Sequence, residues 1–182
     1  MRVIVTGVPG VGKTSVMEGV AKAAAVPIVN YGSIMFEEAK AHKLVTNRDE
    51  MRKLPAETQR HVQAVAGEKV GKMDSAIIDT HCLIRTPEGY LPGIPMTVLT
   101  MIAPHVVVLV EAPPEMIAKR RAKDGTRHRD HDSVEAITEH QHMNRYAAAA
   151  MGVISGATVK IVANLDGDLE SAVATFLEVF GK

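Results

Sequence analysis

Eight residues near the N-terminus carry the clearest chemical signal in the chain. The segment 7–14 reads G-V-P-G-V-G-K-T, follows the apolar run Val3 to Val5, and precedes a helical pattern. This is the GxxxxGK[ST] phosphate-binding loop, in its usual place between a strand and a helix. Its glycines permit close backbone approach, and its free N–H groups form an anion nest at the helix N-terminus. The segment predicts binding of a nucleoside triphosphate.

Three side chains in and beyond this loop have the types needed to act on phosphate. Lys13 supplies a mobile positive charge for the β- and γ-phosphates, and Thr14 offers a hydroxyl to Mg²⁺. Asp79 ends an apolar strand, where a carboxylate reaches Mg²⁺ directly or through water. Carboxylates also end strands without any ligand, so that interpretation of Asp79 stays open. We expect Thr14 and Asp79 to hold Mg²⁺, mainly through water.

Arginines gather in two segments far from the loop in sequence. Arg48 and Arg52 lie in R-D-E-M-R-K-L-P, and a second group lies in R-R-A-K-D-G-T-R-H-R-D, with Arg145 further on. Phosphoryl transfer between two phosphates needs positive charge on several sides, and the arginine fork binds phosphate bidentately. The alternative is ordinary solvated charge, which Asp124 and Asp130 would partly balance. Two arginine segments around one phosphate loop indicate a donor side and an acceptor side.

The composition restricts the class of protein. The 182 residues suffice for one domain, and 21 basic residues balance 21 acidic ones, so no net charge recruits nucleic acid or a membrane. The one cysteine, Cys82, cannot form an internal disulfide and is expected to be a small buried residue. No run approaches the roughly 20 apolar residues of a membrane span, and the short apolar N-terminus is no secretory signal. We expect a single cytoplasmic domain over residues 1–182.

Strands and helices are expected to alternate along the chain. The expected strands are 3–6, 28–29, 76–79, 105–111 and 158–163. The expected helices are 13–24, 34–42, 55–72, 96–102, 113–123, 133–151 and 169–180. A loop rich in proline and glycine is expected over 87–95. The alternation predicts an α/β domain with a parallel sheet covered by helices on both faces.

Motifs along nearly the whole chain resemble those of archaeal adenylate kinases. In chain order they are V-N-Y-G-S, R-D-E-M-R-K-L-P, I-I-D-T-H, R-T-P-E-G-Y-L-P-G-I-P, R-H-R-D, H-Q-H-M-N-R and A-T-V-K-I-V-A-N. The resemblance implies Mg²⁺-dependent phosphoryl transfer from ATP to AMP, giving two ADP. It also implies the P-loop kinase fold, with five parallel strands in the order 2-3-1-4-5, and a homotrimer.

Positions that match the family's motifs imply roles for individual residues. An AMP-site insert would span about 31–73 and a short lid about 124–132. The wider adenylate kinase family has an arginine where this chain has Phe36, so Arg48 or Arg52 is expected to meet the acceptor phosphate. Arg85 is the nearest equivalent of another arginine of that family. The loop at Asp166 resembles the one that edges the adenine.

The implied set has three parts. The ATP-binding residues are Gly7, Val8, Pro9, Gly10, Val11, Gly12, Lys13, Thr14 and Ser15. The AMP-binding residues are Tyr31, Gly32, Ser33, Arg48, Arg52 and Arg85. The catalytic residues are Lys13, Arg120, Arg127, Arg129 and Arg145, and Arg121 matches the family's arginines before the lid without being assigned to catalysis.

No structural zinc is expected. Many adenylate kinase lids bind zinc through cysteines, and this lid has none. The histidines at 128, 131, 140 and 142 do not form a compact four-ligand set in the sequence.

Two other functions are compatible with a phosphate loop. One is a P-loop kinase for another small acceptor, such as UMP, CMP or shikimate. The other is an ATPase or regulatory nucleotide switch that binds RNA or a protein partner. Zero net charge and few aromatic residues argue against RNA binding, and the basic segment 119–129 is its only support.

Overall fold

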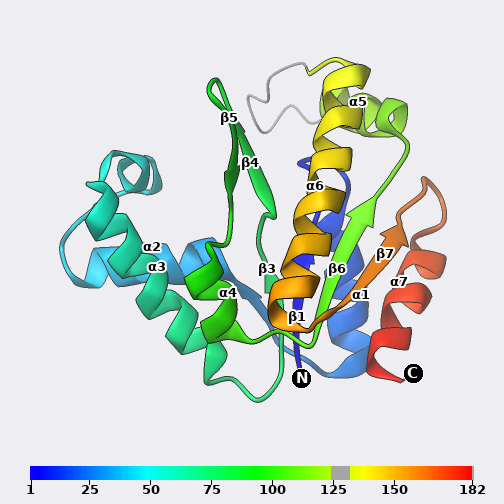
Figure 1. The fold of residues 1–182 in the computed structure, drawn as a ribbon. Coiled ribbons are helices and arrows are strands. Elements are labelled where there is room, and N and C mark those ends of the chain that lie inside the picture. Colours follow the sequence, from blue (N-terminus) through cyan, green and yellow to red (C-terminus); the bar gives the residue numbers. More distant parts are fainter. Residues whose placement is uncertain (124–131, 182) are drawn as a thin grey trace.

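A five-stranded parallel sheet forms the centre of the molecule (Figure 1). The computed structural model describes residues 1–123 and 132–181, apart from the side chains of Asp49 and Arg52. The strands of the sheet are β1 (Arg2–Thr6), β2 (Ile28–Asn30), β3 (Ala76–Asp79), β6 (Val106–Glu111) and β7 (Thr158–Ala163). They lie in the order β2-β3-β1-β6-β7. Counted along the chain, this is the order 2-3-1-4-5, as predicted.

Helices cover both faces of the sheet because its central strands are apolar on both sides. Val3 and Val5 of β1 pack in one apolar cluster with α1 (Lys13–Ala24) and α7 (Leu169–Leu177). Ile4 points the other way, into a cluster with α3 (Ala56–Gly71), α4 (Met96–Ile102) and the C-terminal half of α6 (Val134–Ser155). The period of two along a strand sends alternate residues to opposite faces. α5 (Pro114–Lys123) follows β6, and a short 3₁₀ turn, η2 (Glu178–Phe180), follows α7.

The segment after β2 forms an arm on one side of the sheet (Figure 1). It comprises α2 (Tyr31–Ala41), the 3₁₀ helix η1 (Arg48–Lys53) and α3, with a small apolar cluster of its own. α2 begins at Tyr31, earlier than the predicted residue 34. The side chain of Asn30 accepts a hydrogen bond from the backbone N–H of Ser33 and so caps the helix directly at the end of β2.

The prediction of a loop over 87–95 was wrong in part. Residues on both sides of Pro87 form an antiparallel hairpin of β4 (Leu83–Thr86) and β5 (Gly89–Pro92). Pro87 falls in the turn, and Pro92 ends its strand, so neither interrupts the short ladder. The hydroxyl of Tyr90 donates to Glu139 of α6 at 3.1 Å, which holds the hairpin upright against that helix. This support comes from a residue distant in sequence, and local composition does not reveal it.

The other predicted helices lie where expected, with shifted ends. α6 continues to Ser155 rather than residue 151, because the next residue that takes a left-handed backbone is Gly156, with φ of 74°. The predicted closing helix 169–180 is α7 followed by the turn η2. In the described parts of the chain, no helix combines the length and apolarity that a membrane crossing requires.

Candidate active site

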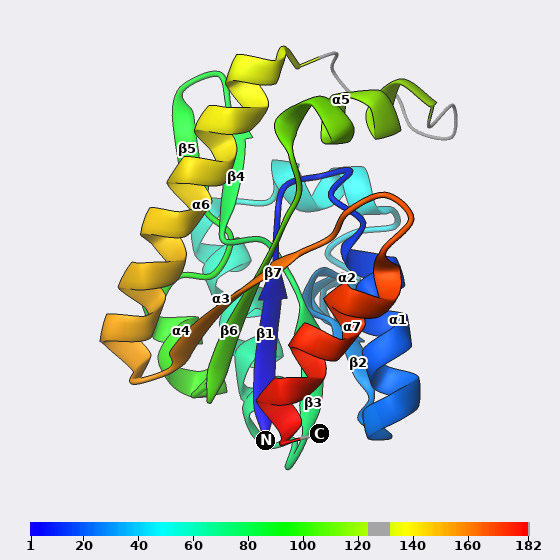
Figure 2. The same cartoon turned by 90° about the vertical axis from the view of Figure 1, so that its right-hand side faces the viewer.

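The phosphate loop lies where β1 ends and α1 begins, at the carboxyl edge of the sheet (Figure 2). Ligands of open α/β sheets bind at this edge. Gly12 precedes the helix with φ of 88°, and no side chain caps the first turn of α1. As a glycine, Gly12 has no side chain that could cap this turn, and the N–H groups of a helix N-terminus without such a cap suit an anion.

The side chains of the loop anchor it from below. Val8 and Val11 are buried in the apolar cluster under the loop, so these two predicted ATP-binding residues offer the ligand only their backbone. Gly7 lies so close to β6 that a Cβ atom would be 2.5 Å from the carbonyl oxygen of Val110. Only glycine fits there. Gly10 also has a left-handed backbone, and Pro9 is exposed.

Lys13 forms an ion pair across the end of the sheet. Its Nζ donates to Oδ1 of Asp79 and to the carbonyl oxygen of Thr80, the latter at 2.9 Å. The Lys13 and Asp79 side chains are 12% and 19% exposed. The loop lysine and the carboxylate that ends β3 meet because β1 and β3 are neighbours in the sheet.

The residues expected to hold Mg²⁺ fit that ion. Thr14 and Ser15 present exposed side chains on the first turn of α1, and Asp79 provides a partly exposed carboxylate. Among residues 1–123 and 132–181, no group of three His, Cys, Asp or Glu side chains forms a cation cage. A hydroxyl and one carboxylate are enough for Mg²⁺, which takes few protein ligands and relies on water and substrate phosphates.

Arg120 joins α5 to the phosphate loop. Its guanidinium donates to the carbonyl oxygens of Val11 at 2.9 Å and Asn164 at 3.0 Å, and it pairs with Asp166. The side-chain amide of Asn164 donates to the same Val11 oxygen at 2.8 Å. Arg120 therefore ties the loop after β7, which includes the predicted adenine edge at Asp166, to the loop that binds phosphate.

Arg121 reaches the same loop from the next position. Its Nε donates to the carbonyl oxygen of Pro9 at 2.8 Å, and Nη1 pairs with Asp132 at 2.7 Å. The side chain is 7% exposed, and Nη2 has no hydrogen-bond partner among the described residues. A buried guanidinium nitrogen without a partner is unusual. The sequence matched Arg121 to the family's lid arginines, and its contact with the loop could not be read from that match.

Arg145 is further along α6. Nε and Nη2 bind the two oxygens of Glu111 at the end of β6, the first at 2.7 Å, and the side chain is 52% exposed. The pair thus lies at the carboxyl edge of the sheet. Arg127 and Arg129, the other two predicted catalytic arginines, fall outside the described residues.

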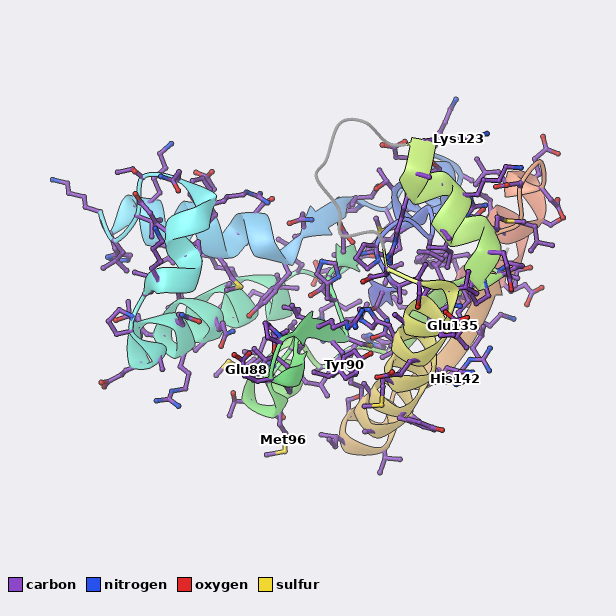
Figure 3. The ribbon with its side chains drawn as sticks, turned by 90° about the horizontal axis from the view of Figure 1, so that it is seen from above. Glu88, Tyr90, Met96, Lys123, Glu135 and His142 are labelled. Atoms are coloured by element: carbon purple, nitrogen blue, oxygen red, sulfur yellow. The ribbon has the colours of Figure 1, made fainter. Side chains whose placement is uncertain are left out.

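The structure separates the candidates for the acceptor phosphate. Arg48 donates to the hydroxyl of Ser33, and its guanidinium carbon lies 5.7 Å from the centre of the Phe36 ring. Arg85 is on the hairpin and pairs with Asp132 at 2.9 Å. From above, the arm of α2 and α3 lies on one side of the hairpin and α6 on the other (Figure 3). The side chain of Arg52 is not among those described.

Tyr31 belongs to the apolar cluster on one face of the sheet, together with residues of β1, α3 and α4. Its ring is 2% exposed, and its hydroxyl donates to the carbonyl oxygen of Gln63 at 2.8 Å. Burial raises the pKa of this phenol. Its side chain therefore joins α2 to α3 in this structure, and Gly32 and Ser33 follow it in the first turn of α2.

Two histidines and the cysteine near the site have shifted pKa values. Desolvation, followed by the positive charge of Lys13, lowers the pKa of His81. Desolvation also lowers the pKa of His140, whose Nε2 lies 3.3 Å from the carbonyl oxygen of Leu83. Both shifts favour the neutral form of the ring. Burial raises the pKa of the Cys82 thiol to about 11, which confirms the prediction that Cys82 is a small buried residue.

Comparisons with known proteins identify the family. Residues 6–138 match the family model described as an AAA domain. A protein of Thermoplasma volcanium named adenylate kinase is 54% identical over 179 residues, which cover 98% of this chain and 99% of the relative. The chain belongs to the adenylate kinase family. An adenylate kinase of Methanopyrus kandleri is 50% identical, with 97% of this chain and 95% of the relative covered.

Solved structures add support for the fold alone. A shikimate kinase from Bacteroides thetaiotaomicron superposes with a TM-score of 0.64 at 16% identity, covering 100% of this chain and 99% of the other. A gluconokinase from Sinorhizobium meliloti gives a TM-score of 0.52 at 13% identity, covering 98% and 92%. At such identities the likeness extends to the P-loop kinase architecture and not to the acceptor.

The backbone of Gly12 yields a test of the phosphate loop. We expect Gly12→Ala to lower the free energy of unfolding by about 1–2 kcal/mol, because a left-handed backbone is unfavourable for alanine. The new Cβ would also meet the Asn164 amide, so ATP affinity should fall at least about tenfold in calorimetry. Gly156→Ala is the matched control: it has a similar φ of 74° with no atom within 4 Å of the added Cβ. Equal ATP affinities in the two variants would contradict this account.

Proposed function

We propose that this chain is an adenylate kinase that transfers the γ-phosphoryl group of ATP to AMP, giving two ADP. The proposal rests above all on relatives that are named adenylate kinase and are 54% and 50% identical to this chain over nearly its whole length. The site agrees with it in having a lysine-bearing phosphate loop and, on the arm, an arginine beside Ser33. The domain layout proposed from the sequence is retained: an acceptor insert at about 31–73 and a lid at about 124–132 of one domain, 1–182.

The protein acts by positioning and by charge neutralisation. The backbone of residues 7–15, which carries N–H groups everywhere but at Pro9, holds the ATP phosphates, and Lys13 exchanges its contact with Asp79 for the phosphate oxygens in transit. Thr14 and Asp79 would hold Mg²⁺, mainly through water, and the bound ion supplies positive charge next to the β- and γ-phosphates. No residue has to activate the acceptor, because the phosphate oxygen of AMP is already anionic.

The arginines complete the neutralisation from the other sides. Arg120 and Arg121 already contact the loop through Val11 and Pro9, and the open Nη2 of Arg121 is available for a phosphate oxygen. Arg145 is on α6 and pairs with Glu111 at the end of β6. Arg127 and Arg129 remain predicted catalytic residues on the lid. Pairing with carboxylates keeps Arg120, Arg121 and Arg145 in place before a nucleotide arrives.

Arg48 is our choice for the acceptor phosphate. Its guanidinium lies over Phe36, the residue that stands where the wider family has an arginine, and it contacts Ser33 of the predicted AMP site. Arg85 is tied to Asp132 and lies nearer the lid base. Arg52 remains a second candidate from the same 3₁₀ helix.

A coupled assay with ATP and each nucleoside monophosphate tests the function. ADP formation that depends on AMP supports adenylate kinase. Activity with UMP, CMP or shikimate instead of AMP would establish a different acceptor, and ATP loss without an acceptor would indicate an ATPase.

Lys13→Met should lower turnover by about three orders of magnitude or more, since a transition-state charge contact is lost in a site that excludes water. Its far-ultraviolet circular dichroism should match the wild type, and wild-type turnover in this variant would contradict the role of Lys13.

A pair of arginine variants tests the acceptor assignment. Arg48→Ala should raise the KM for AMP by about 10–100-fold, because a charge-assisted phosphate contact is lost, while the KM for ATP changes little. Arg85→Ala should have a smaller effect on the KM for AMP. A larger effect of Arg85→Ala would transfer the acceptor role to the hairpin.

We also propose that the protein is a cytoplasmic homotrimer. In support of an assembly, apolar side chains are exposed on the C-terminal half of α6 and on the edge strand β7, among them Tyr146, Val153 and Ile161. Figure 2 has β7 on the near side, between α6 and α7. Val153 alone is 87% exposed. Such an apolar area is typical of a protein–protein interface.

Light scattering after size exclusion measures the assembly. We expect the mass of a trimer for the wild type and a smaller mass for Val153→Glu, because a charge at the centre of an apolar interface is unfavourable. Leu44→Glu, at an exposed apolar residue on the arm, is the control and should leave the mass unchanged. A wild-type monomer would contradict the trimer, and a trimeric Val153→Glu would exclude this face from the interface.

A further inference from the structure

The side chain of Asn30 contacts both Asp79, the partner of the loop lysine, and Ser33 of the acceptor arm. It is the last residue of β2 and the capping residue of α2. In the sheet it is the register partner of Asp79, at the end of β3. The side chains that end two neighbouring parallel strands meet at one edge, so the amide of Asn30 faces the carboxylate.

On the donor side, Asn30 holds one oxygen of Asp79. Its Nδ2 donates to Oδ2 of Asp79 at 2.8 Å, while Oδ1 of Asp79 accepts from Lys13. The carboxylate thus has a separate partner for each oxygen. When Lys13 turns to a phosphate, the contact with Asn30 is the one that keeps Asp79 oriented.

On the acceptor side, the same amide holds Ser33. The Oδ1 atom of Asn30 accepts from the backbone N–H of Ser33 at 2.8 Å and from its hydroxyl at 3.0 Å. The Ser33 hydroxyl in turn accepts from Nη2 of Arg48. Asn30 therefore reaches the acceptor arginine through one intervening hydroxyl.

The orientation of the amide follows from its partners. A carboxylate can only accept and a backbone N–H can only donate, so Nδ2 must face Asp79 and Oδ1 must face Ser33. Arg48 thus donates to Ser33, the Ser33 hydroxyl donates to Asn30, and Asn30 donates to Asp79. Such a chain, with a cation at one end and an anion at the other, strengthens each of its bonds.

We propose that Asn30 is a positioning residue that fixes Asp79 of the donor half relative to Ser33 and Arg48 of the acceptor half. This inference rests on the proposed function, since it concerns the spacing of the two phosphates in that reaction. The residue acts through its neighbours. It makes the geometry of each half depend on the other through a single side chain.

The alternative is that Asn30 merely caps α2, and three variants separate the two roles. Asn30→Ser and Asn30→Asp both retain a capping oxygen for Ser33. Neither can bond Asp79 as the amide does, because a serine that caps is too short and a carboxylate has no N–H. Asn30→Ala loses both contacts. The side chain of Asp168 caps α7 by accepting from the backbone N–H of Ser171. Asp168→Ala removes this cap and controls for the loss of a helix cap alone.

Positioning predicts that kcat falls in all three Asn30 variants, by about 10–100-fold, as is usual when the partner of a site carboxylate is removed. The Kd for AMP, measured by calorimetry without ATP or Mg²⁺, should also rise in Asn30→Ala. Thermal unfolding should show lower stability for Asn30→Ala and Asp168→Ala, with kcat unchanged in Asp168→Ala.

Wild-type kcat in Asn30→Ser and Asn30→Asp would overturn the inference and leave Asn30 as a cap. In that case the wild type still forms ADP from ATP and AMP, so the proposed function stands. A wild type that forms no ADP from this pair would overturn both.

Discussion

The ion pair between Lys13 and Asp79 is the contact on which the arrangement of the site depends. A mostly buried ammonium group needs a partner, since an unpaired charge in that position is strongly unfavourable. Asp79 serves because β3 lies beside β1, which brings the end of one strand next to the loop that follows the other. The pair therefore links the order of the strands to the location of the lysine. A phosphate can replace the carboxylate as the partner of Lys13 without leaving either charge isolated, provided that Asp79 retains Asn30.

The phosphate loop keeps its shape because contacts from several elements converge on it. Val8 and Val11 are held in the core below, and the Val11 carbonyl oxygen accepts from both Arg120 and Asn164. Arg121 secures Pro9 from above. These contacts hold the carbonyl groups of Val11 and Pro9 in place before an anion arrives, and such preorganisation favours phosphate binding.

The arginines around the loop are paired with acids that come from distant parts of the chain. Asp166 follows β7, Glu111 ends β6, and Asp132 joins Arg121 to Arg85 of the hairpin. These pairs compensate much positive charge at one edge of the sheet and hold the guanidinium groups in fixed orientations. Asp132 has a further effect: it connects the hairpin to the base of the predicted lid, two segments that local sequence reasoning treats separately.

The sequence by itself determined the phosphate-loop motif and, through its resemblance, the order of the sheet strands. It also predicted the roles of Lys13 and Thr14 and the burial of Cys82, because the strand–loop–helix pattern and the apolar neighbours that indicate them are local in sequence. The tertiary structure decided the rest. It put Tyr31 in the core and the 83–92 hairpin against α6, and it paired Arg48 with Ser33 and Arg85 with Asp132. Each of these depends on a partner far away in the chain, such as Gln63, Glu139 or Asp132, and only folding brings those partners within hydrogen-bond distance.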